Sequence, residues 1–153
     1  ATDLIRRKWL NNDFGGFTYS LNHKMENIDL TIGGASNRYS GQHYGNVIWA
    51  EYASNANFNH QYYWNKAEKL DHNFYTKTNY AYSDATNIYV DLQRRRIDYI
   101  FEGLDVEGKS AQQEINLAFF NPKFGFYHTL NDNQSLYASF SVANTFSSYA
   151  ILT

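Results

Sequence analysis

Apolar and polar residues alternate with a period of two over three stretches of the chain, and a short polar turn interrupts each stretch. The stretches and their turns are Phe17–Gly33 with 23–27, Asn73–Phe101 with 83–87, and Phe120–Val142 with 131–134. A period of two indicates a strand with one apolar and one polar face, and two such strands around a tight polar turn form a β-hairpin. The sequence therefore predicts three antiparallel hairpins, about six strands in all.

Two longer stretches separate these hairpins. Residues 37–72 are rich in aromatic and polar side chains, and residues 102–113 are rich in Gly, Asp and Glu. We expect both to be long loops, so that short and long connections alternate, as in transmembrane β-barrels with tight periplasmic turns and longer outer loops. Pro122 lies inside a predicted strand, where it cannot donate a backbone hydrogen bond, so we expect a bulge or a pairing break there.

The amino-acid composition indicates what surrounds these strands. Aromatic residues make up 18% of the 153 residues and charged residues another 18%, whereas a soluble domain carries about 25% charge. The predicted polar faces hold mainly Thr, Ser, Asn, Gly and Tyr, which suits a crowded wet lumen, and aromatics near the turns suit an interfacial girdle. The pattern favours an all-β fold, an antiparallel transmembrane β-barrel segment, over a soluble β-sandwich.

Two arginines conflict with a simple lipid-facing strand. Arg94 and Arg96 continue the face of Ile88, Val90 and Leu92, and an arginine at the bilayer midplane costs about 2–4 kcal/mol. Either the arginines lie at the outer headgroup level, where lipopolysaccharide phosphates would pair with them, or a bulge switches the face.

Charge and motifs exclude several function classes. The net charge of -2 gives no basic field for nucleic acid. There is no cysteine and no apolar run of about 18 residues that would form a transmembrane helix. No signal peptide opens the sequence, so we expect a mature form or an internal piece. We find no catalytic motif and predict no enzyme and no cofactor; the five histidines lack metal-ligand spacing, so we predict no metal site.

The candidate site residues fall into two sets. Aromatic faces stack on sugars and chelate rings, so the aromatic side chains of the predicted long loop are candidate ligand contacts, or else they pack that loop against its neighbours. These candidates are Tyr44, Trp49, Tyr52, Tyr62, Tyr63 and Trp64. The second set should face the lumen and contact a plug: Lys77, Asp91, Gln93 and Arg95.

Several segments resemble TonB-dependent outer-membrane receptors of Bacteroidetes-type bacteria. They are Asp3–Phe14, Leu30–Gly34 with Asn37–Tyr39, Val47–Ala50 with Tyr52–Ser54, Phe119–Lys123 with Gly125, and Leu136–Phe140 with Val142–Asn144. The resemblance implies a barrel of about 22 strands, of which residues 1–153 would supply about six as part of a single barrel domain, without the plug. The chain departs from the family after Asn144, where an Arg and a Pro are usual.

The resemblance also implies a function and a location. Such a receptor lies in the outer membrane of a Gram-negative bacterium, in contact with lipid and lipopolysaccharide. It takes up a scarce nutrient such as a siderophore, haem, cobalamin or a glycan, and TonB acts on it through the plug. This chain would form part of the barrel wall and the extracellular loops.

Two alternatives remain open at this point. One is a soluble β-sandwich that binds carbohydrate, and the other is a small complete outer-membrane barrel of about eight strands, with Asp3–Leu10 and Tyr149–Thr153 as partial strands. The membrane hypothesis requires that Phe124, Phe126, Phe140 and Leu30 are not buried against a second layer of the same chain.

Overall fold

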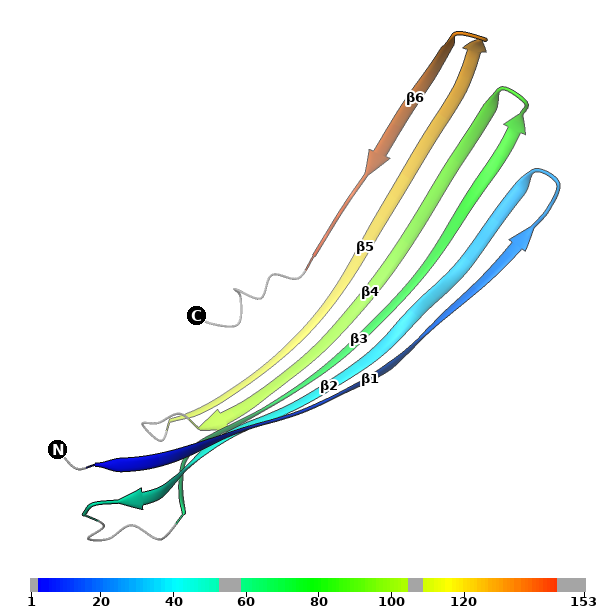
Figure 1. Cartoon of the computed structure of the whole chain (residues 1–153). Helices are drawn as coiled ribbons and strands as arrows, with labels where there is room; N and C mark the ends of the chain where they lie inside the picture. The colour runs from blue at the N-terminus through cyan, green and yellow to red at the C-terminus, as the bar shows by residue number, and fades with distance from the viewer. Residues whose placement is uncertain (1–2, 53–58, 105–108, 146–153) are drawn as a thin grey trace. The chain divides into compact units, whose positions relative to one another are not determined.

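Six β-strands form one sheet in the computed structural model, which describes residues 3–52, 59–104 and 109–145 (Figure 1). The strands are β1 (Leu4–Lys24), β2 (Ile28–Ala50), β3 (His60–Ser83), β4 (Thr86–Leu104), β5 (Ser110–Asn131) and β6 (Gln134–Ser141). Their order in the sheet is their order in the chain, and each is hydrogen-bonded to the next, so the sheet is an antiparallel meander. The predicted all-β antiparallel fold of about six strands is confirmed.

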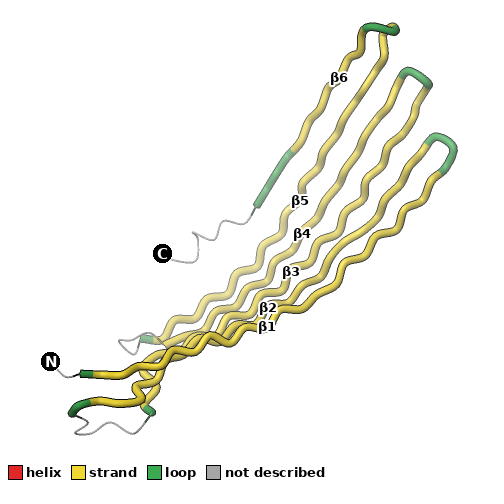
Figure 2. Tube along the Cα trace, in the orientation of Figure 1, coloured by secondary structure: helices red, strands yellow, loops and turns green. Residues whose placement is uncertain are grey.

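The described residues contain strands and loops only (Figure 2). A search of these residues for a helix long and apolar enough to cross a membrane finds none.

The three predicted hairpins are confirmed, with turns at Met25–Asn27, Asp84–Ala85 and Asp132–Asn133. Local hydrogen bonds close them. Met25 donates its N–H to the carbonyl of Ile28 at 2.8 Å. The side-chain oxygen of Asn131 accepts from the N–H of Asn133 at 3.0 Å, which is how Asn stabilises a tight turn without help from other strands.

Pro122 marks the end of the ladder between β5 and β6, as predicted. The last aligned pair is Lys123 with Ser141. Val142 still donates its N–H to the carbonyl of Pro122 at 3.0 Å, but Pro122 has no N–H to return the second bond of such a pair. Beyond this point a side chain joins the two segments instead of the backbone: Oδ1 of Asn121 accepts a hydrogen bond from the N–H of Asn144 at 2.7 Å.

The prediction of long loops at residues 37–72 and 102–113 is wrong for most of these residues, which form strands. β2 continues to Ala50 and β3 begins at His60, and likewise β4 continues to Leu104 and β5 begins at Ser110. These extensions carry polar and aromatic side chains on both faces, so they show no apolar-polar alternation. Backbone pairing does not need that contrast, and Val, Ile, Tyr and Trp favour extended backbone. Residues 53–58 and 105–108, between the strand ends, lie outside the described part.

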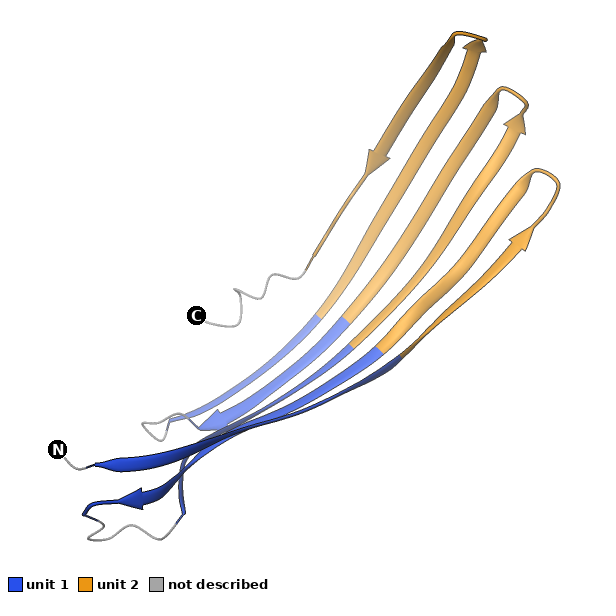
Figure 3. Ribbon diagram, in the orientation of Figure 1, with its two compact units in different colours: residues 1–16, 37–70, 97–116 blue, residues 17–36, 71–96, 117–153 orange. Residues whose placement is uncertain are grey.

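The chain divides into two compact units (Figure 3). Unit 1 consists of Ala1–Gly16, Asn37–Leu70 and Ile97–Asn116, and unit 2 of Phe17–Ser36, Asp71–Arg96 and Leu117–Thr153. Unit 2 contains the three hairpin turns, and unit 1 contains the strand segments that had been predicted as loops.

In unit 2 the strand register separates apolar from polar side chains. On one face of β5 and β6, Phe124 pairs with Phe140 and Phe126 with Ala138. On the other face the pairs are Gly125 with Ser139, Tyr127 with Tyr137, and Thr129 with Ser135. We call these the apolar face and the polar face of unit 2.

No layer of the described chain covers the apolar face. Phe124, Phe126 and Phe140 keep 46%, 38% and 61% of their surface exposed, and Leu30 is half-buried. Among the described residues Ile97 is the one apolar side chain that is fully buried. The sheet therefore lacks the hydrophobic core that a soluble domain would need.

Candidate functional site

The polar face of unit 2 carries a fork-shaped ion pair between β3 and β4. Arg95 donates from Nε to Oδ1 of Asp71 at 2.8 Å and from a terminal nitrogen to Oδ2 at 2.5 Å. The side chain of Asp71 is 12% exposed and that of Arg95 is 40% exposed. Two parallel bonds between charged groups fix orientation as well as distance, so this pair holds the two strands in register.

Asp91 is the most deeply buried acidic residue described, with 2% of its surface exposed. Its Oδ2 accepts from the hydroxyl of Tyr89 at 3.1 Å and from the amide of Gln93 at 3.2 Å. Its Oδ1 is buried and has no hydrogen-bond partner among the described residues. Because a buried acceptor without a donor is costly, Asp91 is the position of unit 2 most in need of a donor from elsewhere.

The structure places the predicted lumen set on odd-numbered positions of β3 and β4. The amide of Gln93 donates a hydrogen bond to Asp91, and the guanidinium of Arg95 donates one to Asp71. The sequence did not identify Asp71 as a member of this set. The ammonium of Lys77 lies 5.1 Å from the ring centre of Tyr75. Asp71 shares the two-residue spacing of Tyr75 and Lys77, which would place all three on the same face of a strand. The sequence did not predict this because Asp71 lies inside the predicted loop 37–72.

Glycines make room for tyrosine rings on the same polar face. A Cβ on Gly125 would lie 3.4 Å from Cβ of Tyr89, and a Cβ on Gly33 would lie 2.6 Å from the ring of Tyr75. On this face Tyr side chains therefore pack directly over Gly.

The predicted ligand-binding aromatics lie in unit 1 or just after β2. Tyr62 and Tyr63 bring their rings within 5.0 Å of each other. The guanidinium of Arg6 lies 5.5 Å from the ring centre of Tyr62, and the ammonium of Lys8 lies 5.9 Å from that of Tyr63. The structure thus adds two cations from β1 that sequence reasoning missed.

The other aromatic candidates have their own surroundings. Tyr44 stacks on Trp9 of β1, with ring centres 6.2 Å apart and planes 17° apart. Trp49 and Tyr52 expose 50% and 72% of their surface, and Trp64 is half-buried in β3. That these six side chains contact a ligand stays a prediction.

A polar network also links β1 and β2 in unit 1. The side-chain oxygen of Asn12 accepts from the hydroxyl of Tyr39 at 2.9 Å and lies 3.3 Å from Nε2 of His43. Tyr99 has its pKa raised, first by burial and then by the charge of Tyr39. These contacts tie the strands of unit 1 together without an apolar layer.

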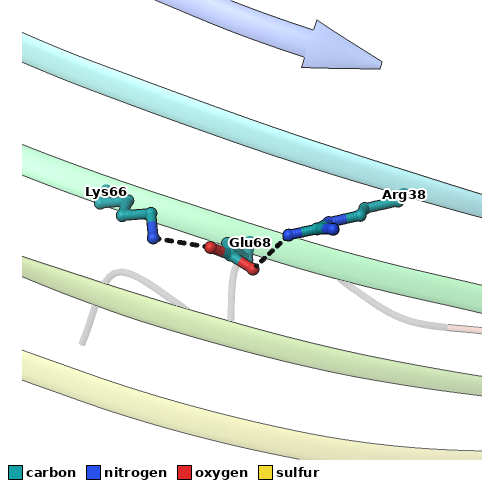
Figure 4. A network of polar contacts seen from close by, with 3 residues as sticks. All are labelled: Arg38, Lys66 and Glu68. Carbon is teal, nitrogen blue, oxygen red and sulfur yellow. Dashed lines mark hydrogen bonds and ion pairs between the residues drawn. The ribbon is translucent and has the colours of Figure 1, made fainter. Parts of the chain in front are cut away.

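Glu68 of β3 bridges two cations in unit 1 (Figure 4). Its carboxylate oxygens lie 2.7 Å from the ammonium of Lys66 and 3.2 Å from the guanidinium of Arg38. The Lys66 ammonium lowers the pKa of Glu68, and Glu68 in turn raises the pKa of Lys66. The strands of unit 1 therefore carry a charged cluster between β2 and β3.

An open hollow of about 510 Å³ lies within unit 2, on the apolar face. Phe17, Phe74, Arg94 and Arg96 line it, together with His72, whose Nδ1 lies 2.8 Å from the hydroxyl of Ser36. Arg94 and Arg96 share this hollow with phenylalanines of the apolar face. The two arginines therefore remain on the apolar face, and no face switch removes them from it.

Three histidines contact neutral side chains: His43 contacts Asn12, His72 contacts Ser36, and His128 contacts the hydroxyl of Thr86 at 2.9 Å. No group of three or more His, Cys, Asp or Glu suited to a metal ion occurs within the described residues.

No protein-family model matches the chain, and no curated protein matches it by sequence. Among solved structures, the ferric yersiniabactin uptake receptor FyuA of Yersinia pestis aligns over 90% of this chain with 10% identity and a TM-score of 0.49. The chain spans 21% of the length of that receptor. A likeness at this level identifies neither family nor function, and it gives no support to a specifically Bacteroidetes-type relationship.

Proposed function

We propose that this chain is part of the wall of an outer-membrane β-barrel of the TonB-dependent receptor kind, and that it extends beyond the membrane surface. The observation that carries the proposal is the apolar face of unit 2, which no described residue covers. An apolar surface of this size would drive aggregation in water. Acyl chains would cover it in a bilayer, and the polar face would then look into a wet interior.

Strand length supports the same proposal. Strands β1 to β5 have 21, 23, 24, 19 and 22 residues, whereas a transmembrane β-strand needs about 9–11. The unit 2 segments are long enough to cross the hydrocarbon, so the unit 1 segments would lie beyond it. Because tight turns belong to the periplasmic side of such barrels, unit 1 would be extracellular, where the Glu68 ion pairs meet water.

In this proposal other strands also take part. β1 and β6 stand at the ends of the order and each pairs with one strand among those described. Unpaired strand edges are not viable in hydrocarbon, so neighbouring strands would have to satisfy them. We propose that they belong to a closed barrel of about 22 strands whose lumen holds a plug on which TonB acts.

In this proposal the two candidate sets have different partners. The polar face that carries Lys77, Asp91, Gln93 and Arg95 would contact the plug, because it would look into the lumen. The unit 1 aromatics with Arg6 and Lys8 would belong to the outer vestibule for a scarce, small nutrient; rings beside cations suit an anionic aromatic ligand. The receptor would perform no covalent chemistry.

A fluorescent probe can test the proposal, because this chain has no cysteine. In a cysteine-free background of the protein that contains the chain, a bimane label would be attached to Phe126→Cys, Tyr127→Cys or Tyr52→Cys. In vesicles of lipids with brominated acyl chains, the label at position 126 should be strongly quenched and the labels at the other two positions weakly quenched. Equal quenching at positions 126 and 127, or a monomer that folds in water without detergent, would contradict the proposal and favour a soluble protein.

A further inference from the structure

Two cations of β1 lie over two tyrosine rings of β3 in unit 1. The guanidinium of Arg6 lies 5.5 Å from the ring centre of Tyr62, and the ammonium of Lys8 lies 5.9 Å from that of Tyr63. Both cations are exposed and both rings are half-buried. Neither cation has a carboxylate partner among the described residues, so the ring faces are the contacts that the structure gives these two charges.

These contacts reach across a strand. β2 lies between β1 and β3 in the sheet, and two strands separated by a third lie about 10 Å apart. Gly45 of β2 keeps the space between them open, because a Cβ there would lie 2.7 Å from the ring of Tyr62 and would also collide with the ring of Tyr63. The rings therefore lie over bare backbone of β2, where the long side chains of β1 reach them.

The hydroxyl of Tyr62 takes no part in holding its ring in place. The hydroxyl oxygen is buried and has no hydrogen-bond partner among the described residues. The ring of Tyr63 lies 5.0 Å from that of Tyr62, with 58° between the ring planes. Ring faces, rather than polar groups, thus hold the two cations.

We infer that this is an autoinhibitory contact: the rings hold Arg6 and Lys8, and a ligand with two negatively charged groups has to take both cations from the rings in order to bind. At an exposed site a cation–π contact is weaker than a charge-assisted hydrogen bond to an oxyanion, so the exchange favours the ligand. The two cations stand two residues apart, about 7 Å along the strand, which suits an anion with two charged groups. The inference rests on the proposed function, which places unit 1 in water.

The exchange predicts opposite effects of the rings and the cations on affinity. A ring that contacts the ligand strengthens binding, whereas a ring that holds a cation weakens the binding of a ligand without an aromatic group. Inorganic pyrophosphate has two phosphoryl groups and no ring, so its affinity reports the release of the cations alone.

The experiment measures pyrophosphate binding by isothermal titration calorimetry, with the protein that contains this chain in detergent micelles at physiological salt. Tyr62→Leu with Tyr63→Leu should bind pyrophosphate about 5-fold more tightly than the wild type, because no ring competes for the cations. Phe101→Leu is the control, since it removes another half-buried ring of unit 1. Its affinity should equal that of the wild type.

Removal of charge tests the cations in the same titration. Arg6→Gln with Lys8→Gln should bind pyrophosphate about 10-fold less tightly than the wild type. Arg7→Gln is the control, because its guanidinium lies 5.9 Å from the ring centre of Trp9 instead, and it should change the affinity by less than about 2-fold. If the double ring variant does not fold, Tyr62→Leu alone should show a smaller rise of affinity.

Equal or weaker pyrophosphate binding by the ring variants would overturn the inference, and so would unchanged binding by the variant without Arg6 and Lys8. The bimane labels at positions 126, 127 and 52 test the proposed function separately. The expected quenching without a rise of affinity in the ring variants refutes only the autoinhibitory contact. A rise of affinity together with equal quenching at positions 126 and 127 refutes the membrane location and leaves the contact standing.

Discussion

The two units show how one sheet can carry two different surfaces. In unit 2 the cross-strand pairs separate into Phe124 with Phe140 on one face and Tyr127 with Tyr137 on the other. In unit 1 the side chains that contact one another are Tyr, Trp, Asn and charged residues, as in the Arg38, Glu68 and Lys66 cluster. Neighbouring strands of the sheet are joined by backbone hydrogen bonds. The backbone therefore determines the fold, whereas the type of side chain differs between the two units. Four comparisons of variants would test this contrast.

The largest effect is expected for a charge on the apolar face. Phe126→Arg should lower the free energy of unfolding in lipid vesicles by about 2–4 kcal/mol, because the guanidinium would enter hydrocarbon. Tyr127→Arg is the matched control, since it is the next residue, on the polar face, with 41% exposure against 38% for Phe126. It should cost less than about 1 kcal/mol. Urea titration in vesicles measures both, and equal losses would show that the two faces meet the same solvent.

The second prediction compares an ion pair from each unit. Arg95→Met removes the two hydrogen bonds that Arg95 donates to Asp71, whose side chain is 12% exposed. The loss should cost about 1–3 kcal/mol, discounted because Arg95 itself is 40% exposed. Arg38→Met in unit 1 leaves Lys66 beside Glu68 and should cost less than about 1 kcal/mol. A larger loss for Arg38→Met in the same titration would reverse the contrast.

The same contrast explains what sequence alone could predict. Unit 2 was predictable because alternation such as Phe17, Tyr19 and Leu21 against hydroxyl residues, together with turns such as Asn131–Gln134, are local signals. The unit 1 strands were missed because stretches such as Val47–Ala50 and Tyr62–Trp64 show no apolar-polar contrast. The lack of contrast predicts loops there, although Val, Ile, Tyr and Trp favour strands.

Cross-strand partners were beyond sequence reasoning for a different reason. Arg95 shares the two-residue spacing of Asp91 and Gln93, which the sequence shows, but its hydrogen bond to Asp71 depends on the register between β3 and β4. The same holds for Asn12 with Tyr39, which lie on β1 and β2. A shift of the pairing register by one residue would turn every side chain of a strand to the other face. No local sequence motif specifies the register between these strands.

The third prediction concerns glycine. Gly33→Ala in unit 2 places a methyl group 2.6 Å from the ring of Tyr75 and 2.7 Å from the carbonyl oxygen of Tyr19, and should cost about 1–3 kcal/mol from overpacking. Gly15→Ala in unit 1 meets nothing within 4 Å and should be neutral or slightly stabilising. Thermal unfolding in detergent compares the two variants. A neutral Gly33→Ala would mean that the Tyr75 ring moves aside freely and that the polar face is loosely packed.

The smallest effect is expected from pH at Glu68. Lys66 lowers the pKa of Glu68 in the folded protein, so its ion pairs stabilise the fold above the unfolded-state pKa and are lost as pH falls through the lower folded-state value. The stability difference between wild type and Glu68→Gln should therefore be present at neutral pH and vanish under acid conditions. Salt should shrink it at neutral pH, because an ion pair exposed to water is screened. A difference that survives both acid and high salt would place Glu68 in a dry environment, which would contradict an extracellular unit 1.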